Sequence, residues 1–246
     1  MTIPGEVMAE LRDRSKVKRI ELTAFRWLPE FTHGYVKDLR VRWALEEAGL
    51  AYDVVLVDAA SKNTDAYRRW QPFGQVPAYR DDEVEMFESG AIVLRIAMDS
   101  PVLAPPDAAS YARVSSWVFA ALNSVEPVVK LFQESQNEAN EQGAGAQTRR
   151  TLAEAHLTTR LTELTAWLAG EPYLEGTFSA GDLMMTTVLR EIGDTEVLRR
   201  FPTLDALRLR CQARPAFQRA LAAQLKTFHD NDPATASPYP SGAIQR

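Results

Sequence analysis

The chain has 246 residues, of which 46% are hydrophobic and 25% charged, a composition typical of a folded globular protein and unlike that of a disordered one. Its net charge of −5 argues against a general nucleic-acid-binding protein, which is basic overall or on one face. No segment approaches the ~18 consecutive apolar residues of a membrane-spanning helix, and the N-terminus lacks the apolar core of a signal peptide. We therefore expect a cytoplasmic protein without membrane or nucleic-acid partners.

Up to about residue 100, strand and helix patterns alternate along the chain. Gly49 is expected to end the first helix. The β-branched run at 51–59 is typical of a buried parallel strand, and a polar turn after residue 80 predicts an antiparallel hairpin. An arm at residues 1–17 is expected to be flexible. Strands are expected at 18–25, 51–59, 76–80 and 84–88, and helices at 35–50, 63–71 and 89–99.

A proline-rich segment at 100–110 separates this part from the rest of the chain. Beyond it every periodic segment has a helical pattern. The sequence therefore predicts an α/β domain at 18–100 and an all-helical domain at 106–230, followed by a loose tail at 231–246.

Within the helical part, local signals predict where helices bend, start and stop. Pro127 predicts a bend in a long helix. Ser179 and Asp182 have the spacing of a capping box, and Pro215 predicts a break between two helices. The single cysteine, Cys211, excludes an intrachain disulfide and is expected to be a packing residue. Helices are expected at 107–135, 148–169, 177–193 and 202–224, with a polar loop at 136–147.

The stretch "QPFGQVPAYRDDEVEMFESGAIVLRIA" at 71–97 carries the strongest functional signal. Pro77 cannot donate to a sheet, and a cis bond before it would turn the N–H and C=O of Val76 outward, toward a peptide-like ligand. An ordinary trans proline on an edge strand is the alternative. Ser89 is expected to be the N-cap of the next helix, where unpaired N–H groups favour a carboxylate. Glu88 beside it can bind an ammonium group, or both residues serve only as a cap.

Three segments together resemble soluble glutathione transferases of the bacterial type, over about residues 19–225: "GQVPAY…FESGAIVLRIA", "VRWALEEAGLAYD" and "FSAGDLMMTTVL". The resemblance implies an α/β thioredoxin-like N-terminal domain that binds glutathione and an all-α helical-bundle C-terminal domain, in a homodimer. It implies that Val76 pairs with the cysteinyl main chain beside a cis Pro77. Glu88 and Ser89 would hold the γ-glutamyl end, and Gln75 would reach the glycyl end.

The residue that activates the glutathione sulfur is less clearly indicated. In the family it is a Tyr, Ser or Cys after the first strand or at the start of the first helix. The chain has no Ser between Ser15 and Ser61 and no Cys before Cys211. The remaining hydroxyls are Tyr35, which aligns with the usual Ser or Cys position, and Thr32. A main-chain N–H is the third alternative.

Two functions follow from the resemblance. As a transferase, the protein would use glutathione as co-substrate and attach its thiolate to a hydrophobic electrophile, with no metal and no nucleotide. Tyr111, Trp117 and Phe119 would then wall the second-substrate pocket, or belong to the core. As a non-catalytic module, the same fold would bind other proteins. The missing cysteine argues against thiol–disulfide exchange.

Overall fold

The computed structural model describes residues 19–137 and 144–233, so the predicted arm at 1–17, half of the loop at 136–147 and most of the tail at 231–246 lie outside the described residues. The described residues of that predicted loop are helical, which corrects its bounds. Its N-terminal part is built on a four-stranded sheet with the order β2-β1-β3-β4. β1 and β2 are parallel, whereas β1–β3 and the hairpin β3–β4 are antiparallel. The strands are β1 (Glu21–Phe25), β2 (Asp53–Val57), β3 (Ala78–Arg80) and β4 (Glu85–Phe87).

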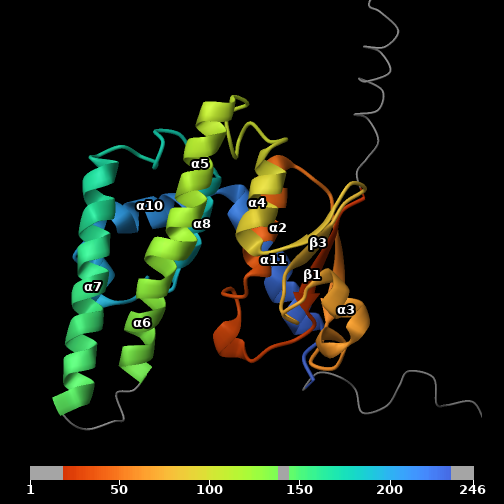
Figure 1. Ribbon diagram of the computed structural model, residues 1–246, viewed down its shortest axis with the longest axis horizontal. Helices are drawn as coiled ribbons and strands as arrows, with labels where there is room; N and C mark the ends of the chain where they lie inside the picture. Colours follow the sequence, from red (N-terminus) through yellow and green to blue (C-terminus); the bar gives the residue numbers. More distant parts are fainter. Residues whose placement is uncertain (1–18, 138–143, 234–246) are drawn as a thin grey trace, which may run out of the picture.

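Helices cover both faces of this sheet (Figure 1). α2 (Asp38–Ala48) and α4 (Ser89–Ala97) lie on one face and α3 (Asp65–Trp70) on the other. The predicted buried strand at 51–59 is wrong in one respect: β2 is an edge strand, and only Val57 of its five residues is fully buried. α2 starts three residues later than expected, because residues 35–37 still form the turns that follow a 3-10 turn, η1 (Glu30–Thr32).

The C-terminal part is entirely helical within the described residues, which confirms the predicted fold class. It adds two short features that were not predicted, the π-helical turn η3 and the helix α9. η3 replaces a smooth bend before Pro127, which has no N–H to complete an α-helical hydrogen bond. The elements are α5 (Ala108–Ala120), η3 (Ala121–Val125), α6 (Glu126–Asn137), α7 (Ala144–Leu168), α8 (Ala180–Arg190), α9 (Glu196–Arg199), α10 (Pro202–Gln212) and α11 (Pro215–Asp230).

Local signals at three helix ends are confirmed. Gly49 ends α2 in the left-handed conformation, with φ of 66°. Ser179 and Asp182 form the capping box of α8, in which Asp182 also accepts from the Leu174 N–H at 2.8 Å. Pro215 is the first residue of α11, so the chain does break into two helices there.

The two parts share one hydrophobic core. α2 lies in its centre, with residues 38–45 consecutively buried. α11 returns from the helical part to pack against α2, beside the sheet (Figure 1). The last helix therefore supports the loop that connects β1 to α2. None of the described helices is long and apolar enough to cross a bilayer.

Candidate functional site

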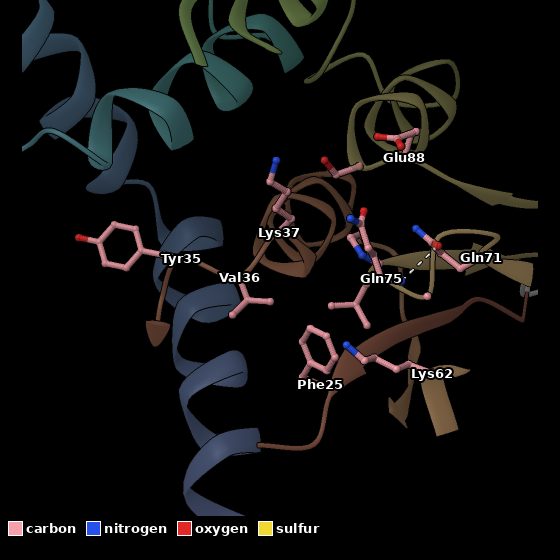
Figure 2. A pocket seen from close by; sticks show the side chains of 12 residues that line it. Phe25, Tyr35, Val36, Lys37, Lys62, Gln71, Gln75 and Glu88 are labelled. Atoms are coloured by element: carbon pink, nitrogen blue, oxygen red, sulfur yellow. Dashed lines mark hydrogen bonds between the residues drawn. The ribbon is translucent and has the colours of Figure 1, made fainter. Parts of the chain in front are cut away.

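A cavity of about 330 Å³ opens beside the start of α2, between β1, the loop before β3 and the start of α4 (Figure 2). All five residues predicted to bind a peptide-like ligand line it, together with Tyr35, whereas Thr32 does not. The complete lining is Phe25, Tyr35, Val36, Lys37, Lys62, Gln71, Gly74, Gln75, Val76, Pro77, Glu88 and Ser89.

The backbone at Val76 is available to a ligand. The Val76–Pro77 peptide bond is cis, as predicted. Neither the N–H nor the C=O of Val76 makes a hydrogen bond with any residue of the described ranges, although the side chain is buried. Backbone groups in a folded protein are rarely left unpaired, so this pair can bind an extended peptide in the manner of an added strand.

A chain of hydroxyls supports the loop from underneath. The Thr23 hydroxyl accepts from the Ala78 N–H at 2.7 Å and contacts the Tyr67 hydroxyl at 3.0 Å, and Tyr67 donates to the Gln75 C=O at 2.6 Å. Burial raises the pKa of Tyr67, which keeps this hydroxyl protonated as a donor. Sequence reasoning missed Thr23 and Tyr67. The one available signal was a polar residue at the centre of the apolar strand Glu21–Phe25.

The same loop is shaped by Gln71 and Gly74. The buried Gln71 side chain accepts from the N–H groups of Phe73 at 2.8 Å and Gln75 at 3.2 Å. Gly74 has φ of +63°, and a Cβ there would lie 3.0 Å from the Lys62 carbonyl oxygen. A side chain at this position would therefore push the loop away from Lys62, one of the two cations that line the cavity.

Glu88, at the cavity rim, has an unusual backbone conformation for a residue with a side chain. Its φ of 71° and ψ of 113° belong to a region that costs about 1–3 kcal/mol and that concentrates at functional sites. Its carbonyl accepts the first hydrogen bond of α4, from the Ile92 N–H at 2.9 Å, so Glu88 is the N-cap. The prediction that Ser89 is the N-cap is therefore wrong.

Ser89 is instead the first residue of α4 and is buried. Its hydroxyl accepts from Arg40 Nη1 at 3.4 Å, and Arg40 pairs with Glu126 at 3.2 Å. Lys37 also contacts Glu126, at 2.8 Å. Burial alone would raise the pKa of Glu126, but the charges of Arg40 and Lys37 lower it below the ordinary value. This buried ion pair links the cavity to the start of α6.

Charge is distributed across the cavity. Glu88 is exposed and makes no ion pair with a described residue. On the β1 side, the Lys62 Nζ lies 5.9 Å from the centre of the Phe25 ring and likewise has no carboxylate partner among residues 19–137 and 144–233. Figure 2 shows Glu88 and Lys62 on opposite sides of the Gln75 side chain. The cavity therefore offers one free carboxylate and one free ammonium group; Lys62 had no signal in the sequence.

The predicted activating hydroxyls are not directed into the cavity. The Tyr35 ring stacks against the Arg190 guanidinium at 5.0 Å, and Figure 2 shows its hydroxyl pointing away from the other labelled side chains. The Thr32 hydroxyl donates to the Pro29 C=O at 2.7 Å within the 3-10 turn, which explains its absence from the lining. The N–H groups of Val36 and Lys37, before the first turn of α2, have no partner among the described residues.

Comparisons with known proteins show what this chain resembles, first over its N-terminal part. Residues 31–97 match the family model of the glutathione S-transferase N-terminal domain. This segment therefore resembles a glutathione S-transferase N-terminal domain. A stretch of 55 residues is 42% identical to the probable glutathione S-transferase GSTF1 of Oryza sativa subsp. japonica. This matched stretch covers 22% of this chain and 25% of the rice protein.

Solved structures extend the likeness in fold to nearly the whole chain. Ure2p in complex with glutathione has a TM-score of 0.69 at 17% identity, over 89% of this chain and all of that one. A glutathione transferase from Burkholderia graminis, with two glutathione molecules bound per subunit, has a TM-score of 0.68 at 21% identity, over 89% and 95% of the two chains. The predicted resemblance and the glutathione transferase fold are thus confirmed.

Proposed function

We propose that this protein binds glutathione in the cavity and transfers it to a hydrophobic electrophile. The unpaired N–H and C=O of Val76 carry this proposal, because they match the main chain of the cysteinyl residue. The flanking charges match the two ends of the molecule. Glu88 would bind the γ-glutamyl ammonium, with Ser89 at its carboxylate, while Lys62 and Gln75 would bind the glycyl carboxylate. The structures of Ure2p and the B. graminis protein, both with bound glutathione, support the same ligand.

The start of α2 would supply the catalytic stabilisation. A thiol with a pKa of about 8.5 is mostly protonated at pH 7. The free N–H groups of Val36 and Lys37 and the helix dipole favour the thiolate. That thiolate would form a carbon–sulfur bond with the electrophile as the leaving group departs with its electron pair. Tyr35 acts as the hydroxyl donor only after its ring turns away from Arg190.

Glutathione titration by calorimetry, with thiolate absorbance followed against pH, tests this function. We expect binding, with a pKa of the bound thiol below that of free glutathione and unchanged in Tyr35→Phe, because the hydroxyl points out of the cavity. A pKa that rises in Tyr35→Phe would assign activation to Tyr35 instead of the main chain. Absence of binding at millimolar glutathione would contradict the proposed function.

The orientation of Tyr35 also favours a second candidate, a glutathione-binding protein without transferase activity. Such a protein would bind glutathione but leave its thiol pKa at about 8.5, and it would not conjugate a general electrophile such as 1-chloro-2,4-dinitrobenzene. The homodimer, implied by the resemblance, and the cytoplasmic location, expected from the sequence, belong to the main proposal. Sedimentation equilibrium at micromolar concentration tests the dimer.

The support beneath the Val76 loop gives a further expectation. Tyr67→Phe should lower the free energy of unfolding by about 0.5–1.5 kcal/mol, because the Gln75 C=O loses its hydrogen-bond donor, and should weaken glutathione binding as the loop relaxes. Tyr111→Phe is the matched control, since its hydroxyl also donates to a carbonyl, that of Leu94 at 3.1 Å, but away from the cavity lining. Equal losses of glutathione affinity in both variants would contradict a role for Tyr67 in the site.

A further inference from the structure

A second, smaller hollow adjoins the proposed glutathione site. It lies between the start of α2 and the end of α8, and it shares Tyr35 and Val36 with the larger cavity. Its volume is about 10 Å³, close to the minimum that holds one water-sized group. Arg190, the last residue of α8, forms part of its wall.

The guanidinium of Arg190 is held firmly in this wall. It lies 5.0 Å from the centres of the Tyr35 and Phe217 rings, and its Nη1 donates to the Gly34 C=O at 2.8 Å. Two aromatic faces and a backbone carbonyl therefore fix its plane. Of its five N–H donors, only this one has a hydrogen-bond partner among the described residues.

Arg190 is partly buried, yet it makes no ion pair with any residue of the described ranges. The other charged groups of the hollow are neutralised: Arg40 pairs with Glu126, and Glu191 pairs with Lys130. Several other arginines of similar or deeper burial do have a carboxylate within 4.0 Å, as in Arg42 with Asp38, Arg208 with Asp205 and Arg214 with Glu47. The hollow thus carries one uncompensated positive charge, which is costly unless something binds it.

We propose that Arg190 binds a carboxylate of the second substrate, so that the preferred electrophile is an apolar molecule bearing an acidic group. A planar guanidinium with free N–H donors matches a carboxylate and forms strong charge-assisted hydrogen bonds with it. The hollow has room for a single oxygen atom rather than a ring, which suits the end of such a group. This inference rests on the proposed function, because the substrate reaches Arg190 from the glutathione sulfur past the shared residues Tyr35 and Val36.

Calorimetry with pairs of stable glutathione conjugates tests the inference without requiring turnover. Each pair consists of an S-alkyl glutathione and the S-(ω-carboxyalkyl) glutathione of equal chain length, over a series of lengths. At the length that reaches Arg190 we expect the carboxylate to bind about tenfold more tightly than its neutral partner, as one charge-assisted contact allows. In Arg190→Gln this ratio should fall to about one, whereas Arg200→Gln, which alters an exposed arginine paired with Glu154, should keep it.

The outcomes separate the two proposals. If glutathione and the S-alkyl conjugates bind but no carboxylate is preferred at any length, Arg190 only packs between two rings; the inference then falls and the proposed function stands. A preference that persists in Arg190→Gln would also overturn the assignment. If neither glutathione nor any conjugate binds, both proposals fall. The wild-type comparison needs no variant, so it can overturn the inference even where Arg190→Gln fails to fold.

Discussion

Replacing Glu126 with alanine is expected to lower the free energy of unfolding by about 3–5 kcal/mol, the usual cost of leaving a buried charge without its partner. Arg40 has 3% of its surface exposed, and Glu126 is its carboxylate partner, at 3.2 Å. Without that carboxylate the guanidinium keeps, among the described residues, only its 3.4 Å contact with the Ser89 hydroxyl. Because Ser89 lines the cavity, glutathione affinity should fall as well.

Glu154→Ala is the matched control. Its pair with Arg200 at 2.8 Å is about half exposed on both sides, so we expect a loss of at most about 1 kcal/mol. Urea denaturation with comparable m-values measures both variants. Similar small losses in the two variants would show that the Arg40–Glu126 pair contributes no more than a surface pair.

The Glu126 prediction includes a pH dependence. Because Arg40 and Lys37 hold the pKa of Glu126 below its ordinary value of 4.5 in the folded protein, its stabilisation is fully present above that value. It is lost as the pH falls through the folded pKa. The difference in unfolding free energy between wild type and Glu126→Ala should therefore shrink under acid conditions. A difference that stays constant down to acid pH would show that the carboxylate's charge does not matter.

Asp182→Ala is expected to cost a similar amount, about 3–5 kcal/mol, for a different reason. The Asp182 carboxylate is fully buried and accepts from the Leu174 N–H at 2.8 Å and from the Ser179 N–H and hydroxyl, both at 3.0 Å. Alanine would leave these buried donors unpaired, and each unsatisfied group costs about 1–3 kcal/mol. The segment before α8 and the first turn of α8 would lose their common anchor.

Asp107→Ala serves as the comparison, since Asp107 is also an N-cap but is exposed and accepts only from the Ser110 N–H, at 2.8 Å. A cap of that kind contributes about 1 kcal/mol. Thermal and urea unfolding of the two variants should differ clearly. Equal losses would mean that Asp182 acts as an ordinary cap.

The two buried carboxylates should respond to pH in opposite directions. Burial raises the pKa of Asp182 to about 6, more than its hydrogen bonds lower it. The part of the free energy of unfolding that depends on protonation of Asp182 is therefore complete below the ordinary pKa of 3.8. This part is lost as the pH rises through about 6. Comparing wild type with each alanine variant across this range separates the two contributions.

Local sequence signals predicted most of the secondary structure correctly, because each depends on neighbouring residues. A glycine that tolerates positive φ ended α2 at Gly49, and a proline without an N–H opened α11 at Pro215. The predictions were wrong where a side chain interacts with a residue that is distant in the sequence. Ser89 has the residue type of an N-cap, but its hydroxyl lies against Arg40, and Glu88 takes the cap position.

The candidate site shows the same division. Val76, Pro77, Glu88 and Ser89 are close in sequence, and their local pattern was sufficient to predict a peptide-like ligand there. The groups that stabilise the cavity lie far apart in the sequence. The contacting hydroxyls of Thr23 and Tyr67 are separated by 44 positions, and the paired Arg40 and Glu126 by 86. No local period or spacing encodes such pairs.

By itself, the sequence determined the order of the main strands and helices, several helix ends and the family resemblance, because backbone propensity and capping act over a few residues. Only the tertiary structure decided that Tyr35 stacks on Arg190 with its hydroxyl directed out of the cavity, and that Arg190 has no carboxylate partner among the described residues. Both outcomes depend on how α8 and α11 pack against the loop before α2. That packing is set by buried surface and hydrogen bonding between segments more than 150 positions apart, such as Gly34 and Arg190.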